Sequence, residues 1–291
     1  MEFLQPARWS EALETKAAHP EVLPIAGGTD VMVEINMDRG RPPALLDLTR
    51  VRELTEWGMD DGVLRIGSGV TYARIIEELG ERLPGLAMAS RTVGSPQIRN
   101  RGTVGGNLGT ASPAGDAHPP LLASDAQVEL ASTSGTRRVA AREFFVAPKR
   151  SAMRKDELVA AFLMPLAHGG QQFAKVGTRN AMVIAVCSFA IDINARRRRV
   201  GTGIGSAGPT PLRAVEAEAF IEGVFDEEKT WDRRAELPGS AVARFGELVA
   251  AAARPIDDVR GTAAYRRHAL AVLARRCLRW AWDETRTSEI E

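Results

Sequence analysis

The sequence predicts a mixed fold of helices and strands that is divided into two domains. Its 291 residues exceed a typical domain of roughly 100–200 residues, and 44% are hydrophobic, so large cores can form without disulfides or metal. Short apolar segments bounded by glycine, proline or aspartate predict strands. A C-terminal segment with apolar residues at helical spacing predicts a long helix.

The first part of the chain is predicted to alternate short strands and helices. Strands are expected at 22–26, at 44–49, at 63–69 after the turn at 60–62, and in a hairpin of 127–133 and 136–140 around Ser134-Gly135. Helices are expected from Ser10 to about Ala18, at 29–37 with Thr29 or Asp30 as the cap, from Thr71 to about Leu79, and at 118–126. The apolar segment 156–165 ends at Pro165.

The second part is predicted to begin a few residues beyond the loop at 168–172. Segments 171–179, 183–193 and 198–208 predict three strands or a strand–helix–strand unit, and a helix is expected to open at Thr210 and Pro211. In the last helix, a 3-4-3 spacing predicts one buried stripe, formed by Leu270, Leu273, Cys277 and Trp280.

Charge and cysteine content exclude several classes of protein. A net charge of +1 argues against general nucleic-acid binding. The basic run Arg196–Arg199 comes just after Asp192 and Asn194, so we expect it to form a solvated hairpin tip or a surface for a partner. The two cysteines, Cys187 and Cys277, are too few to hold an iron–sulfur cluster, and they indicate a reducing compartment.

No targeting or membrane segment is apparent in the chain. The N-terminus lacks the basic and apolar regions of a signal peptide, and the longest apolar run, 181–193, is short of the roughly 20 residues that span a bilayer. We therefore expect no membrane span and a cytoplasmic location.

Two glycine pairs carry the strongest chemical signal. PIAGGTD at 24–30 follows a predicted strand and opens a helix, and TVGGN at 103–107 lies in a stretch that is too glycine-rich for a helix core and too polar for a buried strand. Glycine lets main-chain N–H groups approach an anion closely. Either loop alone could be an ordinary turn, but together they could clamp a pyrophosphate from both sides.

Other motifs are weaker. Asp116 could accept hydrogen bonds from a ligand or form an Asx turn. The pattern Gly203–Gly208 matches a dinucleotide fingerprint, but a charged RRRRV segment precedes it and Pro209 follows it, so a glycine-rich sheet edge or turn is favoured. The chain shows no metal-ligand cluster and no hydrolase motif, so it offers no catalytic or metal-binding residue of its own, and a cofactor would carry any reaction.

The two glycine loops together resemble the FAD-binding subunit of the molybdenum hydroxylases, the family of xanthine dehydrogenase and aerobic carbon monoxide dehydrogenase. The resemblance rests on LPIAGGTDVMVE (23–34) and on the stretch from QIRNRGTVGGN to QVEL (97–130). It continues through DELVAAFLMP (156–165) and QFAKVGTRNAMVIA (172–185), and more loosely through 203–214 and 265–276.

The resemblance implies an α+β fold with an FAD-binding domain of the vanillyl-alcohol oxidase (PCMH) type, followed by a smaller α+β domain of the CO dehydrogenase flavoprotein type. The first domain would span 1–175, with subdomains of about 1–55 and 56–175, and the second would span 176–291.

The resemblance also implies which residues hold FAD. The first pyrophosphate loop would comprise Pro24, Ile25, Ala26, Gly27, Gly28, Thr29, Asp30 and Val31. The second would comprise Thr103, Val104, Gly105, Gly106 and Asn107. Asp116 falls on an acidic FAD contact, Val93 and Val159 fall on apolar positions near the flavin, and Lys175 falls on a lysine whose charge would stabilise reduced flavin.

The implied function is an electron-transfer subunit. A molybdopterin-binding large subunit oxidises the substrate, a small subunit with [2Fe–2S] clusters passes electrons on, and the FAD subunit delivers them to an external acceptor, in a heterotrimer or a dimer of heterotrimers. Arg179–Met182 resembles xanthine dehydrogenases more than carbon monoxide dehydrogenases. The alternatives are the medium subunit of a carbon monoxide dehydrogenase-type enzyme, a stand-alone flavin oxidoreductase, for which Tyr72 and Tyr265 offer no convincing acid or base, and a partner protein that has lost FAD.

Overall fold

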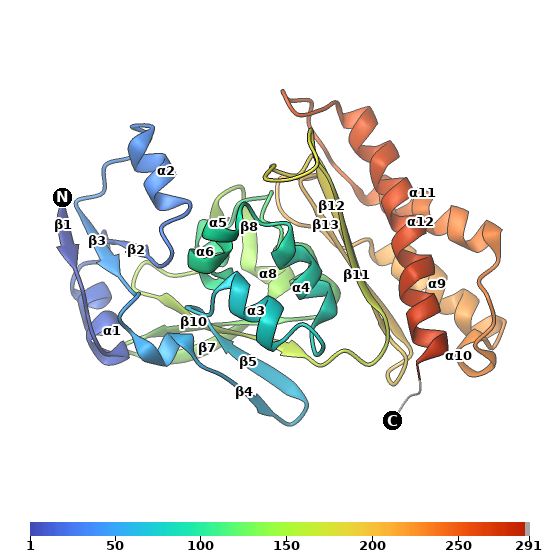
Figure 1. The fold of residues 1–291 in the computed structure, drawn as a ribbon, viewed down its shortest axis with the longest axis horizontal. Coiled ribbons are helices and arrows are strands. Elements are labelled where there is room, and N and C mark those ends of the chain that lie inside the picture. The colour runs from blue at the N-terminus through green and yellow to red at the C-terminus, as the bar shows by residue number, and fades with distance from the viewer. Residues whose placement is uncertain (289–291) are drawn as a thin grey trace.

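The computed structural model describes residues 1–288 as three main sheets with helices packed on their faces (Figure 1). The strands are β1 (Glu2–Leu4), β2 (Leu23–Ile25), β3 (Ala44–Asp47), β4 (Trp57–Asp60), β5 (Val63–Gly67), β6 (Gln127–Ser132), β7 (Gly135–Ala140), β8 (Phe145–Ala147), β9 (Arg150–Ser151), β10 (Leu158–Pro165), β11 (Gln171–Val176), β12 (Cys187–Asn194) and β13 (Arg199–Gly205). The helices are α1 (Trp9–Ala18), α2 (Val31–Asn36), α3 (Tyr72–Glu78), α4 (Pro84–Arg91), α5 (Pro96–Arg101), α6 (Val104–Thr110), α7 (His118–Ala123), α8 (Ala141–Phe144), α9 (Val215–Glu227), α10 (Thr230–Arg233), α11 (Gly239–Ala252) and α12 (Ala263–Thr287), with a 3-10 turn, η1 (Arg52–Thr55).

The N-terminal sheet is small and parallel, in the order β1-β3-β2. Helix α1 packs beside it, but Arg8 is its N-cap in place of the predicted Ser10. The reason is Glu11, whose carboxylate accepts hydrogen bonds from the main-chain N–H groups of Ala7 and Arg8 and so fixes the first turn two residues earlier.

The second sheet is antiparallel in the order β4-β5-β10-β6-β7. The predicted strand after Asp61-Gly62 and the predicted hairpin around Ser134-Gly135 are confirmed, and the structure adds β4 before Asp61, which was not predicted. Asp61 and Gly62 both have positive φ, at 47° and 74°, as a tight hairpin turn requires. Helices α4 and α5, also missed, lie with α3 and α6 over this sheet (Figure 1).

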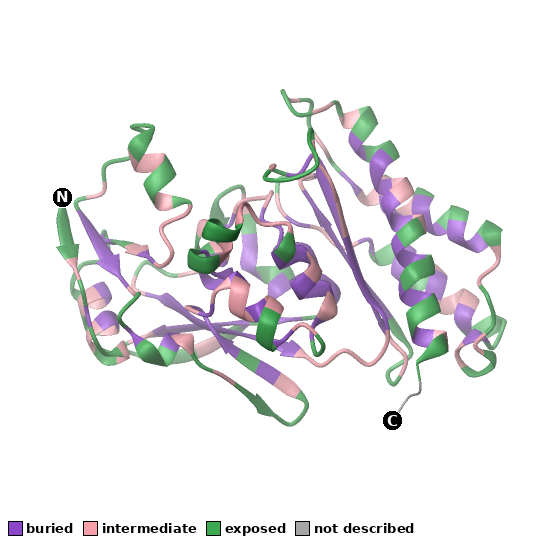
Figure 2. Cartoon of the chain, viewed as in Figure 1, coloured by how far each residue is buried: buried purple, intermediate pink, exposed green. Residues whose placement is uncertain are grey.

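The third sheet is β11-β12-β13, so the three-strand alternative is the correct one. Its strands are mostly buried on both sides (Figure 2). The dinucleotide-like glycines lie in and just beyond β13, where a Cβ on Gly201 or Gly203 would come within 1.9 or 2.0 Å of a carbonyl oxygen of α7. These glycines therefore serve close packing of a helix on the sheet, which confirms the sheet-like interpretation of this motif.

Two details of the C-terminal helices differ from the predictions. Helix α9 begins at Val215, not at Pro211, because Leu212 forms an antiparallel bridge with Ile204 of β13. In α12, Leu270, Leu273 and Cys277 are buried as predicted, but Trp280 is 48% exposed and Trp282 is buried in its place. Trp282 packs against Phe225 with ring centroids 4.7 Å apart, so the buried face turns toward α9 along the helix.

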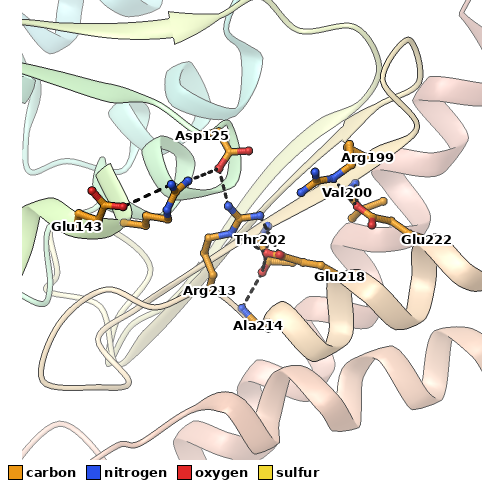
Figure 3. A network of polar contacts seen from close by, with 10 residues as sticks. Asp125, Glu143, Arg199, Val200, Thr202, Arg213, Ala214, Glu218 and Glu222 are labelled. Carbon is orange, nitrogen blue, oxygen red and sulfur yellow. Dashed lines mark hydrogen bonds and ion pairs between the residues drawn. The ribbon is translucent and has the colours of Figure 1, made fainter. Parts of the chain in front are cut away.

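Polar contacts join the part of the chain that contains the second sheet and helix α7 to the part that contains the third sheet and helix α9. Figure 3 shows Asp125, just after α7, accepting a hydrogen bond from Arg213 at 2.5 Å, while Arg213 also pairs with the buried Glu218 of α9 at 2.8 Å. Glu218 in turn accepts from the Thr202 hydroxyl at 2.6 Å. The basic hairpin tip is solvated, as predicted, and Arg198 pairs with Asp232 there. The predicted division of the chain at residue 175, which falls inside β11, stays a prediction.

A buried amide–carboxylate cluster also lies at this junction, and it yields a stability prediction. Gln171 donates to Asp192 Oδ2 at 2.8 Å and to Ser124 at 3.3 Å. Burial raises the pKa of Asp192 from 3.8 to about 6, although these hydrogen bonds oppose the shift. The folded state therefore binds more protons than the unfolded state between these values, and stability falls as pH rises through that window.

We expect Asp192→Asn to be more stable than the wild type at pH 7.5 by about 1–3 kcal/mol, because it removes a buried charge. At pH 3.5 the carboxyl is neutral, so the advantage should vanish. Urea unfolding at both pH values measures the difference. This assignment of the pKa would be contradicted if the variant were less stable than the wild type at pH 7.5, or if it exceeded the wild type in stability by the same amount at pH 3.5 and pH 7.5.

Candidate functional site

A cavity of about 620 Å³ lies between the glycine loops, the helices α3, α5 and α6, and the segment that follows β11. All but three of the residues predicted to hold FAD line it: Pro24, Ala26, Gly27, Gly28, Thr29, Asp30, Val31, Val93, Thr103, Gly105, Gly106, Asn107, Asp116 and Val159. Among the others, Ile25 and Val104 are buried away from it, and Lys175 lies behind Asp116.

The first glycine loop runs from β2 into α2. A Cβ on Gly27 would lie 1.9 Å from the carbonyl oxygen of Arg101, so the main chains of the two loops touch at this point. Gly28 has φ of 75°, a conformation that favours glycine. The main-chain N–H groups of Gly27 and Gly28 donate to no described residue. They remain free for an acceptor in the cavity.

The second glycine pair lies in a helix, which corrects the prediction that this stretch is too glycine-rich for one. The Thr103 side chain caps α6 by accepting from the Gly106 N–H at 2.9 Å. A Cβ on Gly105 would lie 2.3 Å from Ser68, so tertiary packing requires glycine there despite its poor helix propensity. Gly106 differs, since its Cβ would meet only Thr103 at 3.2 Å and would otherwise face open space.

Asp116 and Lys175 form a buried ion pair at the cavity wall. Lys175 Nζ donates to Asp116 Oδ2 at 2.6 Å and to the Thr92 carbonyl at 3.1 Å, and the two charged side chains are 8% and 9% exposed. Burial raises the pKa of Asp116, and the charge of Lys175 partly offsets that rise. The other oxygen, Oδ1, is buried with no hydrogen-bond partner among the described residues, so it can accept from a ligand.

His118 packs behind the cavity wall and contacts the main chain of Asn107. It is fully buried at the start of α7, and its Nε2 lies 3.2 Å from the Asn107 carbonyl. Since a carbonyl only accepts, Nε2 carries the proton. Burial lowers the pKa of His118 to about 4, so the ring is neutral at physiological pH. The side-chain oxygen of Asn107 has no partner, which leaves a second acceptor beside that of Asp116.

Several lining residues were not predicted from the sequence: Leu48, Thr49, Leu54, Thr55, Ser68, Gly69, Thr71, Tyr72, Gly94, Ile98, Asn100, Arg101, Gly109, Thr110, Met153, Leu158, Met182, Val183 and Ile184. Met182–Ile184 come from the segment between β11 and β12, so the second half of the chain contributes one wall. Arg101 directly precedes the predicted second loop, and its proximity to Gly27 is a signal that only the fold reveals.

The cavity residues fit FAD. The cavity volume lies within the roughly 300–1,000 Å³ of cofactor sites, and the cavity offers the free main-chain donors of Gly27 and Gly28, beside the N-terminus of α6, for a diphosphate. The unpartnered oxygens of Asn107 and Asp116 offer acceptors for hydroxyl or amide groups. Within residues 1–288, no cluster of His, Cys, Asp and Glu is arranged to hold a metal ion. Across the same range, no helix is both long and apolar enough to span a bilayer.

Comparisons with known proteins agree with this chemistry. Residues 1–167 match the family described as the FAD binding domain in molybdopterin dehydrogenase, and residues 172–281 match the CO dehydrogenase flavoprotein C-terminal domain. A xanthine dehydrogenase FAD-binding subunit of Escherichia coli is 32% identical to this chain, in an alignment that covers 73% of this chain and 76% of that subunit. The nicotinate dehydrogenase FAD-subunit of Eubacterium barkeri is also 32% identical, in an alignment that covers 76% of this chain and 79% of that subunit.

The fold is shared with a solved structure as well. A chain of the CO dehydrogenase from Oligotropha carboxidovorans superposes with a TM-score of 0.88 over 98% of both chains, at 25% identity. The predicted α+β architecture of an FAD-binding domain and a flavoprotein C-terminal domain is therefore confirmed.

Proposed function

Because the chain belongs to the family of FAD-binding subunits of the molybdopterin dehydrogenases, we propose a specific placement of its cofactor and partners. Its cofactor is FAD, and it is the FAD-containing oxidoreductase component of a molybdenum hydroxylase. When bound, FAD supplies the chemistry that passes electrons from the iron–sulfur clusters of such an enzyme to an external acceptor.

The glycine loops would hold the diphosphate of FAD. The observation that carries this proposal is the contact between Gly27 and the main chain of Arg101, just before the second loop, which brings the free N–H groups of the first loop and the N-terminus of α6 to one cavity. Val93, Val159 and Lys175 would lie toward the flavin. There the ammonium of Lys175 favours negative charge nearby, and Asp116 keeps that ammonium in place at 2.6 Å.

The partners would be a molybdopterin-binding large subunit and a small subunit with [2Fe–2S] clusters, in a heterotrimer or a dimer of heterotrimers. Relatives named as medium chains, of the glyceraldehyde dehydrogenase of Sulfolobus acidocaldarius and the carbon monoxide dehydrogenase of Hydrogenophaga pseudoflava, support such an assembly. Both cysteines of this chain are buried and apart from the cavity, so the clusters must come from another subunit.

The specific enzyme would be of the xanthine dehydrogenase type, in the cytoplasm, with FAD held mainly by residues 1–175 and covered by residues 176–291. The 32% identity to a xanthine dehydrogenase FAD-binding subunit, beside 26% to a carbon monoxide dehydrogenase medium chain, supports this proposal.

Purification from the native host through a tag on this chain tests the proposal. We expect a yellow complex that contains FAD, molybdopterin and acid-labile sulfide, together with two further subunits, and that reduces an added acceptor when xanthine is supplied. A colourless chain that does not take up FAD would refute the cofactor placement. A flavin-loaded chain that turns over a substrate alone would instead favour the stand-alone oxidoreductase.

A further inference from the structure

Tyr72 lies where the two glycine loops meet. It is the first residue of α3, and its main-chain N–H donates to the Gly102 carbonyl at 3.0 Å. A Cβ on Gly102 would lie 3.2 Å from the edge of the Tyr72 ring, and a Cβ on Gly27 would lie 2.9 Å from the Gly102 nitrogen. The ring therefore packs directly against the second loop, which packs in turn against the first.

The surroundings of the ring fix its position. Thr71, the N-cap of α3, bridges Thr103, the N-cap of α6, so both helices start side by side. Tyr72 is only 3% exposed and belongs to the large hydrophobic core that the second sheet forms with its helices. It also lines the cavity. The ring cannot turn out into solvent without opening that core.

The hydroxyl of Tyr72 lacks a protein partner. It makes no hydrogen bond to any residue within 1–288, and it is not one of the buried side-chain atoms that lack a partner, so it is accessible from the cavity that Tyr72 lines. A hydroxyl that reaches the cavity without a protein partner is available to a ligand atom that arrives there.

The hydroxyl acts as a donor. Burial raises the pKa of Tyr72 well above its usual range, and the nearby charges of Asp116 and Asp30 raise it further. The phenol therefore keeps its proton at every physiological pH, and it suits a ligand atom that accepts. Among the groups of a flavin dinucleotide, the diphosphate is the strongest acceptor, and it is the group suited to the junction of the glycine loops.

We propose that the Tyr72 hydroxyl donates a hydrogen bond to the diphosphate of FAD, as a third contact beside the main-chain groups of the two glycine loops. The inference rests on the proposed placement of the diphosphate between those loops. It assigns Tyr72 to cofactor binding and not to the electron-transfer step.

Tyr72→Phe tests the proposal because it removes only the hydroxyl. In the full-length chain freed of flavin, the melting temperature should stay unchanged, since the hydroxyl makes no hydrogen bond to the protein. The Kd for FAD, measured by calorimetry, should rise about 10-fold, as expected for a hydrogen bond to a charged group. If the hydroxyl had a purely structural role, Tyr72→Phe would lower the melting temperature of the flavin-free chain, and that result would overturn the proposal.

Tyr265→Phe is the matched control. Tyr265 is the only other tyrosine in the sequence, is 49% exposed on α12, and does not line the cavity. This variant should bind FAD as the wild type does. An equal loss in both variants would show that the effect is not specific to the cavity and would overturn the proposal.

Titrations with ADP and AMP locate the contact. Tyr72→Phe should weaken ADP about as much as FAD and leave AMP nearly unchanged, because AMP lacks the diphosphate. If AMP is weakened equally, the hydroxyl contacts another group and the proposal fails. If the wild type binds neither FAD nor ADP, the cofactor placement itself fails. If the wild type binds both and Tyr72→Phe binds them equally well, only the inference about Tyr72 fails.

Discussion

Gly106→Val is expected to lower FAD affinity by about 100-fold or more, because it would cost at least two charge-assisted hydrogen bonds of the glycine loops. Gly106 is the glycine of the second loop whose Cβ would meet only Thr103 and otherwise enter open space beside the cavity. The valine side chain would hold the diphosphate away from the main chain. The flavin-to-protein ratio of the purified variant, and its Kd for added FAD, measure the loss.

The fold should survive this substitution, which separates it from its neighbours. Gly27→Val and Gly105→Val would drive a side chain into the Arg101 main chain or into Ser68, so those variants should also unfold at lower temperature. Gly223→Val is the control, because Gly223 lies in helix α9, has open space around it and is outside the cavity. Full flavin content in Gly106→Val would show that the diphosphate does not approach this loop.

The second large effect is expected at the buried ion pair. Lys175→Met leaves the carboxylate of Asp116 buried and unpaired, which should lower the free energy of unfolding by about 3–5 kcal/mol at pH 7.5. The double variant Lys175→Met/Asp116→Asn should recover most of that loss, because no charge remains in the interior. Chemical denaturation of the flavin-free chain measures both.

The pH dependence of Lys175→Met follows from the same carboxylate. Without the ammonium, the pKa of Asp116 would rise further in the folded state, so the variant would lose stability as pH rises above the ordinary carboxylate range. Near pH 4 it should approach the wild type. Lys149→Met, which breaks the exposed pair with Glu34, should cost at most about 1 kcal/mol at any pH. A loss at Lys175 as small as that, or one that is the same at pH 4 and pH 7.5, would mean that the pair is not desolvated as the structure describes.

Local patterns in the sequence predicted much of this fold. The strand after Asp61-Gly62 and the hairpin around Ser134-Gly135 followed from turn residues beside apolar runs, and the Thr71 cap followed from its position before a helical pattern. These features depend on neighbours in the chain, so a single sequence contains the information that specifies them.

The features that the sequence did not predict depend on distant contacts. Helix α6 carries a glycine at 105 because Ser68 leaves no room for a side chain there, and nothing near 105 in the sequence indicates that contact. Tyr72 shows the same limit at the site, since its place in the cavity depends on the bridge between Thr71 and Thr103. The predicted burial of Trp280 is wrong because Trp282, which packs against Phe225 of α9, takes the buried position at this end of α12.

The touching main chains at Gly27 and Arg101 also have a kinetic consequence. The contact consists of protein atoms alone and joins segments more than seventy residues apart, so we expect the entropy of closing that long loop to be lost during folding and not when the nucleotide arrives. A chain stripped of flavin under mild conditions should consequently take the dinucleotide back in one fast bimolecular phase, with no slow rearrangement behind it.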